Sequence, residues 1–174
     1  MRRHANDAHR VHTFFRRVLA PALNGEATAA GGRPSPDNSG DIRALHTFST
    51  DSGRTWSTPV LLAGSGAPFS DPGASSFEEA LVLDQTMHHL LAVYYEKPTK
   101  DSDLVELRYR VLQADGTWSP PVTIDRTPYA TPGGEMRFGD YFGAQAQDGV
   151  LHVVHHPLDP TDGYEYIAYV AVRY

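Results

Sequence analysis

The sequence predicts an all-β protein built from antiparallel sheets, and two patterns carry that prediction. The first is a turn-rich octet, 49–56, that stands between two strand-like apolar runs. The second is a repeat: Thr-Trp-Ser-Thr-Pro-Val at 55–60 returns 62 positions later as Thr-Trp-Ser-Pro-Pro-Val at 117–122. Apolar runs separated by turn residues are typical of hairpins, and a repeat of this length indicates four strands with generous loops. We therefore expect units of similar construction along the chain from residue 41 onward.

The octet, Ser-Thr-Asp-Ser-Gly-Arg-Thr-Trp, contains the groups that a tight hairpin needs. Asp51 and Ser52 can bend the backbone through side-chain hydrogen bonds to nearby amides, and Gly53 adopts a positive φ at little cost. Trp56 brings a large apolar ring that can lie against the sheet, with its indole N–H free to bond a carbonyl. The octet therefore predicts a hairpin that is held by its own side chains.

The second copy of the motif is degenerate. It lacks the leading Ser and is shorter between its Asp and its Trp, but it keeps the same chemistry in Asp115, Gly116, Thr117 and Trp118. Because the shorter turn offers fewer hydrogen bonds, we expect Trp118 to be held less firmly than Trp56.

The pattern Ser-x-Asp-x-Gly-x-Thr-Trp resembles the Asp-box, the bacterial neuraminidase repeat of sialidases and related six-bladed β-propellers. Its five defining positions are occupied by Ser49, Asp51, Gly53, Thr55 and Trp56. In that family the box lies between the third and fourth strands of a blade, on the outer rim and away from the catalytic pocket. The resemblance therefore implies an architecture more strongly than an activity.

Further strand candidates extend this architecture. They cover, in order, residues 77–83, 89–95, 104–112, 122–124, 141–146, 150–155 and 166–172. Together with the first hairpin they predict a partial β-propeller of about two and a half four-stranded antiparallel blades, similar to the C-terminal portion of a sialidase-like propeller. A propeller removes its sheet edges by closing a ring. We therefore expect two open edges and self-association through them, with partial instability of the isolated chain.

Residues 1–40 differ in kind from the blades at 41–174. A short N-terminal helix is predicted over 7–19, with apolar residues on one face, Asp7 as its N-cap and Pro21 as its stop. The residues that follow, 24–40, are dominated by Gly, Ala, Ser, Pro and Asn and predict a flexible linker. Two roles are open for this arm: an irregular extension, or an apolar cover for an exposed sheet edge.

The best candidate site is the segment Arg-Phe-Gly-Asp-Tyr-Phe-Gly at 137–143, which opens the innermost strand of the third unit. In a propeller such strand starts line the mouth of the central channel. Arg137 could bind a carboxylate bidentately, Asp140 could orient it, and Tyr141 could stack on a sugar ring. The alternative is that Asp140 caps a turn and the aromatic residues pack between blades.

The resemblance implies catalytic roles for Arg137, Asp140 and Tyr141. Sialidases of this fold use three arginines that bind the substrate carboxylate, a Tyr nucleophile assisted by Glu, and an Asp acid/base, and they are an exception to the usual pair of carboxylates. The Arg-Ile-Pro motif that supplies the family's first arginine is absent from this sequence. A complete arginine clamp is therefore not expected.

Glu78 and Glu79 occupy the corresponding opening of the preceding unit and are candidate ligand-binding residues. Neighbours on a strand point to opposite sides, so one of the two should face the channel. The alternative is that they are solvated carboxylates. Arg108 and Arg110 lie on a third strand and are expected to be charges on the blade surface.

Composition narrows the range of partners. A net charge of -6 and a pI near 5.8 argue against nucleic acid as a partner, and no apolar run is long enough to span a membrane.

There is no cysteine, and the nine histidines do not have the spacing of metal ligands, so we expect no metal and no cofactor. The N-terminus lacks the pattern of a signal peptide; the resemblance implies a secreted or cell-surface protein if further sequence precedes it.

Two functions follow from these observations. One is a sialidase-like glycoside hydrolase, an exo-glycosidase acting on sialylated or related glycans, which the octet and the segment at 137–143 favour. The other is a non-catalytic carbohydrate-binding or structural repeat module, which the missing arginine motif favours. In both cases the expected partner is a glycan or another small carbohydrate.

Overall fold

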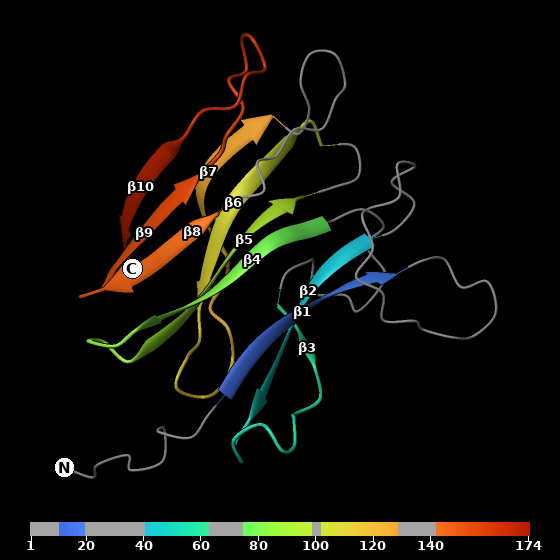
Figure 1. The fold of residues 1–174 in the computed structure, drawn as a ribbon, viewed down its shortest axis with the longest axis vertical. Helices are drawn as coiled ribbons and strands as arrows, with labels where there is room; N and C mark the ends of the chain where they lie inside the picture. Colours follow the sequence, from blue (N-terminus) through green and yellow to red (C-terminus); the bar gives the residue numbers. More distant parts are fainter. Residues whose placement is uncertain (1–10, 20–40, 63–74, 99–101, 129–141) are drawn as a thin grey trace.

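The computed structural model describes residues 11–19, 41–62, 75–98, 102–128 and 142–174, with the backbone alone described at 11–19, 41–43 and 75–78. Within these ranges the chain forms three antiparallel sheets and no helix (Figure 1). The prediction of an all-β fold is confirmed.

The three sheets follow one another along the chain. The first has the order β1 (Val11–Leu19), β2 (Asp41–Ser49) and β3 (Val60–Leu61). The second has the order β4 (Ser75–Asp84), β5 (His89–Lys97), β6 (Leu104–Val111) and β7 (Val122–Pro128). The third has the order β10 (Ala168–Arg173), β9 (Val150–His155) and β8 (Gly143–Gln147). The predicted four-stranded unit thus forms one complete blade, and the strands predicted at 141–146 and 166–172 begin two residues later than expected.

The predicted N-terminal helix is wrong where the chain is described. Residues 11–19 form strand β1, which pairs with β2 along its whole length, from Val11 opposite Ser49 to Leu19 opposite Asp41. The segment is rich in β-branched and aromatic residues, which favour strands, and so short a helix is marginal by itself. Pairing with β2 therefore prevails, and the arm covers a sheet edge as a strand. The predicted linker at 24–40 lies outside the described residues.

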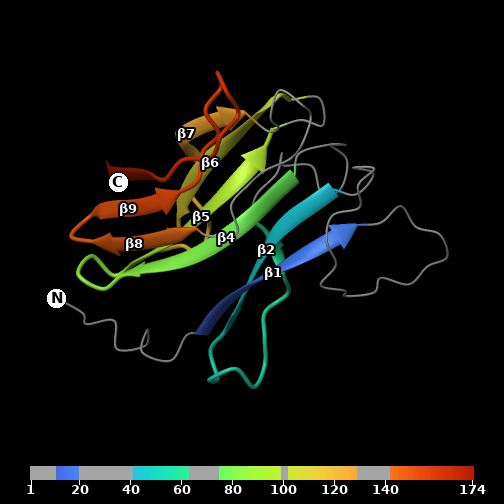
Figure 2. The ribbon, with the colours of Figure 1, turned by 45° about the horizontal axis from the view of Figure 1, so that its top comes forward.

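The hydrophobic core lies on both faces of the second sheet. Toward the third sheet, β5 and β6 present Leu91, Val93 and Leu107 to Leu151 and Val153. Toward the first sheet, the buried cluster consists of Ala92 and Tyr94 with Ala44 and Leu62. Successive residues of a strand point to opposite faces, so β5 is buried on both sides, and Figures 1 and 2 show its sheet between the other two.

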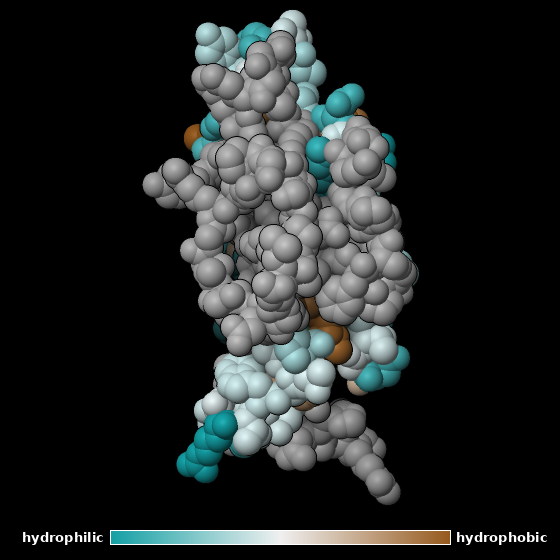
Figure 3. Space-filling model, turned by 90° about the vertical axis from the view of Figure 1, so that its right-hand side faces the viewer, coloured by the Kyte–Doolittle hydropathy of each residue, from teal (hydrophilic) through white to brown (hydrophobic). Residues whose placement is uncertain are grey.

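The surface of the described residues is largely polar on the side shown in Figure 3, where their atoms at the upper and lower ends are mostly teal or pale. None of the described residues belongs to a helix that is long and apolar enough to cross a membrane.

Candidate functional site

The octet forms the predicted hairpin turn between β2 and β3. Ser49 Oγ accepts a hydrogen bond from the Gly53 amide at 2.8 Å and donates one to Asp51 Oδ1 at 2.7 Å. Asp51 also accepts from the Thr55 amide at 2.8 Å and from the Thr55 hydroxyl at 2.7 Å. Ser52 and Gly53 have φ angles of 60° and 86°. The hydrogen bonds from Thr55 and Ser49 lower the pKa of Asp51 to about 2, so the carboxylate stays ionised and holds the turn.

Trp56 does not lie buried against the sheet, as we expected it to. Its side chain is 44% exposed, and an edge carbon of its ring lies 3.7 Å from where a Cβ at Gly53 would stand. The ring therefore leans over its own turn and leaves much of its surface in water.

The second motif repeats this construction with fewer bonds. Asp115 Oδ1 accepts from the amide and the hydroxyl of Thr117 at 2.9 and 2.7 Å, and Gly116 has a φ of 85°. Ser119 Oγ accepts the Val111 amide at 2.9 Å, as Ser57 Oγ accepts the Phe48 amide at 3.1 Å in the first motif. The two motifs are thus structural repeats as well as sequence repeats.

Trp118 is held more firmly than Trp56, which reverses our expectation. Its ring packs against the cluster of Ala44, Leu62, Ala92 and Tyr94 between the first and second sheets. It also meets the His46 ring edge to face, with the centroids 5.2 Å apart, and its indole nitrogen lies 3.4 Å from His46 Nδ1. Trp118 has a neighbouring sheet to pack into, which compensates for the shorter turn.

The arginines of β6, which we expected to be charges on the blade surface, bind partners within the protein. The Arg108 guanidinium binds the carboxylates of Glu96 and Glu106. Glu106 in turn accepts from Arg126 Nε and from the Thr123 hydroxyl, each at 2.9 Å. Burial alone would raise the pKa of Glu106, but these hydrogen bonds and the charge of Arg108 outweigh it and the pKa is lowered. The group is a network of charges that ties β5, β6 and β7 together.

Arg110 ties two sheets together through backbone carbonyls. It donates to the carbonyl of Ser119 at 2.5 Å and to that of Leu62 in the first sheet. Arg108 and Arg110 are therefore both committed to partners within the protein.

Glu78 and Glu79 lie in a β-bulge that the sequence did not reveal. Phe77 pairs with Tyr95 and Ala80 pairs with Val93, so both glutamates stand opposite a single residue of β5. A bulge interrupts the alternation of side chains, and the prediction that the two point to opposite faces has no basis there. The Glu79 side chain is half-buried. Both residues remain predicted ligand-binding positions.

Arg137, Asp140 and Tyr141 lie outside the described residues, and their catalytic roles remain predictions. The next residue, Phe142, is described and packs against the core between the second and third sheets, with its ring centroid 6.2 Å from that of Tyr95. This position agrees with the alternative that aromatic residues of the segment pack between blades.

A buried hydrogen bond between Tyr95 and His155 joins the second and third sheets, and no pattern in the sequence predicted it. The Tyr95 hydroxyl lies 2.8 Å from His155 Nδ1, and His155 Nε2 lies 3.4 Å from Asp125 Oδ2. His155 is fully buried, which lowers its pKa despite the charge of Asp125. Tyr95 and His155 are 60 residues apart, so only the packing of the sheets brings them together.

The loop between β9 and β10 presents two exposed tyrosines on a hydrogen-bonded frame. Thr127 Oγ1 accepts the Leu158 amide at 2.7 Å, and the Asp159 and Tyr164 backbones are joined by a hydrogen bond of 2.9 Å. On this frame Tyr164 is 70% exposed and Tyr166 is 50% exposed. Their role was not predicted from the sequence, although Tyr-Glu-Tyr within a loop rich in Asp, Pro and Gly is a usable signal.

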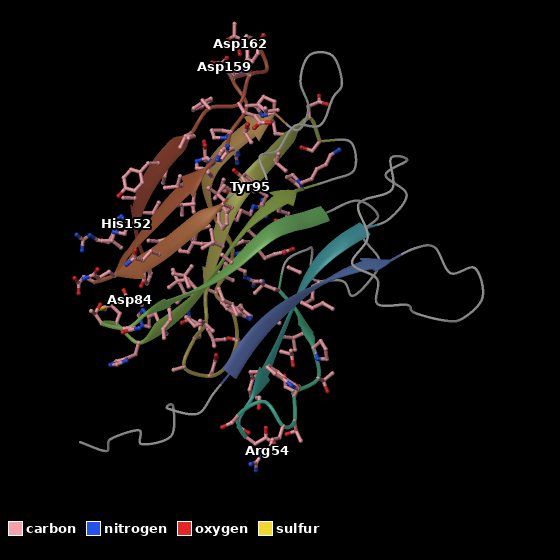
Figure 4. The ribbon with its side chains drawn as sticks, viewed as in Figure 1. Arg54, Asp84, Tyr95, His152, Asp159 and Asp162 are labelled. Carbon is pink, nitrogen blue, oxygen red and sulfur yellow. The ribbon has the colours of Figure 1, made fainter. Side chains whose placement is uncertain are left out.

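This tyrosine loop, 156–167, leaves the third sheet at the end where β8 begins. Gly143, the first residue of β8, pairs with Val154 near the end of β9. The tyrosine loop directly follows β9, and Phe142 alone separates residues 137–141 from β8 in the sequence. Figure 4 labels Asp159 and Asp162 in this loop, far from Asp84, the last residue of β4 in the second sheet. Where side chains are described, no three His, Asp or Glu residues are grouped as metal ligands would be.

Comparison with known proteins identifies the fold. No protein-family model matches the chain, and no curated protein matches it in sequence. Among solved structures, the Hadza microbial sialidase Hz136 matches 75% of this chain with a TM-score of 0.51 and 16% sequence identity. The match spans 29% of that sialidase. The three sheets thus have a sialidase-like β-propeller fold.

Proposed function

We propose that the protein is a non-catalytic carbohydrate-binding module of sialidase-like fold, and that Tyr164 and Tyr166 bind the glycan. The observation that carries this proposal is the pair of exposed tyrosines on a hydrogen-bonded loop, at the end of the sheet where the inner strand β8 begins. In the sequence, the predicted site residues shortly precede β8.

The chemistry of aromatic rings supports a sugar ligand. The C–H faces of a pyranose ring carry partial positive charge, and the face of a tyrosine ring is electron-rich. Glu165, exposed between the two tyrosines, adds an acceptor for sugar hydroxyls. Because backbone hydrogen bonds already order the loop, little conformational entropy is lost on binding. A shallow site of this kind should bind with a Kd on the order of 1 mM.

The state of the arginines in the second sheet favours binding over hydrolysis. Holding the carboxylate of a sialoside requires arginines whose guanidinium groups are free to form bidentate hydrogen bonds. Among the described residues, Arg108 and Arg126 already bind glutamates and Arg110 binds carbonyls. These three side chains are thus occupied by partners within the fold.

Titration with sialyllactose and with lactose, followed by NMR, tests the proposal. Tyr164→Ala and Tyr166→Ala should each weaken binding at least about fivefold, which corresponds to the loss of about 1 kcal/mol. Arg54→Ala, in the distant octet, is the matched control and should bind as the parent does. Unchanged binding in the variant that lacks both tyrosines would refute the assignment.

A second candidate is a sialidase-like exo-glycosidase that uses Arg137, Asp140 and Tyr141, with Glu78 or Glu79 as a ligand-binding residue that faces the channel. The sialidase-like fold and the hydrogen-bonded octet favour it. Hydrolysis of a fluorogenic sialoside that is lost in Tyr141→Phe and in Arg137→Ala, but kept in Tyr164→Ala, would establish this activity and displace the first proposal.

A further inference from the structure

The third sheet ends in an open strand. In the first and second sheets, β2 and β6 each receive an outer strand, β3 and β7. The corresponding strand of the third sheet is β10, which pairs with β9 on one side and, within the described part of the chain, with no strand on the other.

The register shows which backbone groups β10 offers at this edge. The Tyr174 amide donates to the Gly149 carbonyl at 3.1 Å, so residue 174 points toward β9. Backbone groups alternate in direction along an antiparallel strand. The N–H and C=O groups of Tyr169, Ala171 and Arg173 therefore point away from β9, toward the open edge.

Within the described residues, this edge shows few of the features by which proteins protect exposed strands. Natural edge strands are blunted by proline, by inward-pointing charges, by bulges or by a covering loop. The sequence of β10, Ala-Tyr-Val-Ala-Val-Arg, has no proline or glycine, and its pairing with β9 is continuous. Ile167, which precedes the strand, is 73% exposed, and Tyr169 within it is 62% exposed. The edge is thus ready to accept another strand.

We propose that β10 is a self-association site, at which β10 of a second copy of this chain adds antiparallel around a two-fold axis at Ala171. In this register Ala171 faces its own copy, and Tyr169 faces Arg173 of the partner subunit. Each of these pairs exchanges two backbone hydrogen bonds, because the groups that point outward on one strand meet those of the other. The two third sheets become one continuous sheet, and the contact is closed because the same surface is used twice.

The side chains of this edge complement themselves in that register. Tyr169, Ala171 and Arg173 lie on one face and are exposed. Across the axis, the guanidinium of Arg173 of the partner subunit lies over the electron-rich Tyr169 ring, a favourable cation–π arrangement. His152 holds that ring in place, since the two rings stack at 18° and the Tyr169 hydroxyl lies 2.6 Å from His152 Nδ1.

Other registers are less favourable. A two-fold axis at Arg173 would place two like charges directly opposite each other, which destabilises a strand pair. An axis at Tyr169 would leave Arg173 beyond the partner strand and remove its contact with the ring. The small side chain of Ala171 at the axis allows the two strands to approach without a clash.

A single introduced cysteine tests both the pairing and its register, because the chain has no cysteine of its own. In a hydrogen-bonded antiparallel pair the Cα atoms are about 5.5 Å apart, which a disulfide can span. Ala171→Cys should therefore form a disulfide-linked dimer under mild oxidation. Val154→Cys is the matched control: it is exposed on the same face, but three strand spacings across the sheet and four residues along it, roughly 20 Å in all, separate it from its copy.

Light scattering after size exclusion gives an independent measurement. The parent chain should be a dimer, and Ala171→Pro should be a monomer with the same circular dichroism, because the lost N–H points away from β9 and proline is tolerated at a sheet edge. Arg173→Glu should weaken the dimer at least tenfold, and adding Tyr169→Lys should restore it through an ion pair. A monomeric parent chain, or cross-linking of Ala171→Cys no faster than of Val154→Cys, would overturn the proposal.

Discussion

Asp84 and Tyr174, which are 90 residues apart in sequence, are joined by a hydrogen bond of 2.7 Å from the tyrosine hydroxyl to Asp84 Oδ2. The same oxygen accepts the Gly149 amide at 2.9 Å, and Oδ1 accepts the Thr86 and Met87 amides of its own turn. Burial by itself would raise the pKa of Asp84, but these hydrogen bonds outweigh it and the pKa is lowered. One buried carboxylate thus joins the first hairpin of the second sheet to the third sheet.

Removing the Tyr174 hydroxyl should loosen this junction. Tyr174→Phe keeps the ring packed but deletes a hydrogen bond to a charged group, so the free energy of unfolding should fall by about 1.5 kcal/mol or more. Asp84→Ala should lower the melting temperature further, because it removes the acceptor from several donors at once. Thermal and urea unfolding followed by circular dichroism measure both changes.

The matched control for Asp84 is Asp162→Ala, which removes an exposed carboxylate that caps only its own loop through the Tyr164 amide. Its melting temperature should stay close to that of the parent. If Asp84→Ala melts no lower than Asp162→Ala, the carboxylate is not the junction between the sheets.

The two tryptophans should differ in their contribution to stability, and in the order opposite to that expected from the motifs. Trp118→Ala should destabilise the protein by about 3 kcal/mol, because it leaves a cavity between the first and second sheets. Trp56→Ala should lower the free energy of unfolding by roughly 1 kcal/mol, because Trp56 is already 44% exposed and its truncation removes less buried apolar surface. Denaturant melts of the two variants test this, and a larger loss in Trp56→Ala would contradict it.

The buried His155 should make stability depend on pH. The pKa of His155 in the folded chain is lowered below the ordinary value of about 6.5. As the pH falls, the unfolded chain therefore takes up a proton on this ring at a higher pH than the folded chain does. The contribution of the neutral ring to the free energy of unfolding is therefore complete above about pH 6.5, and it is lost as the pH falls from there through the pKa of the folded state. Asp125 and His156 act on this ring with opposite signs. Urea melts between about pH 7 and 5 should show the loss, and His155→Gln should reduce the slope.

The contribution of the octet to stability should depend on pH in a lower range than that of His155. The folded pKa of Asp51 is about 2, below the unfolded value of about 3.9. Its contribution to stability is therefore present above about pH 4 and lost as the pH falls through about 2. Asp51→Asn should flatten the acid limb of the stability curve. Asp115→Asn, in the second motif with fewer donors, serves as the comparison and should flatten it less.

The sequence by itself determined the secondary structure of the blades and the turn of the octet. Hairpins are local: the positive φ at Gly53, the donors of Thr55 and the acceptor Asp51 lie within a few residues, so composition and spacing are enough to predict them. The strands of the second sheet were predictable for the same reason, because their apolar runs are bounded by turn residues.

The tertiary structure decided which side chains those strands bury and which they leave free. Residues 11–19 form a strand because the edge of β2 offers a ladder of hydrogen bonds that local propensity does not reveal. Trp118 is held because another sheet lies beside it, and Arg108 is occupied because Glu96 and Glu106 stand on neighbouring strand positions. Tyr95 and His155 meet, and Glu78 and Glu79 share a bulge, through pairing between distant segments. These outcomes depend on contacts between residues far apart in the chain, whose free energies exceed the small differences in local preference.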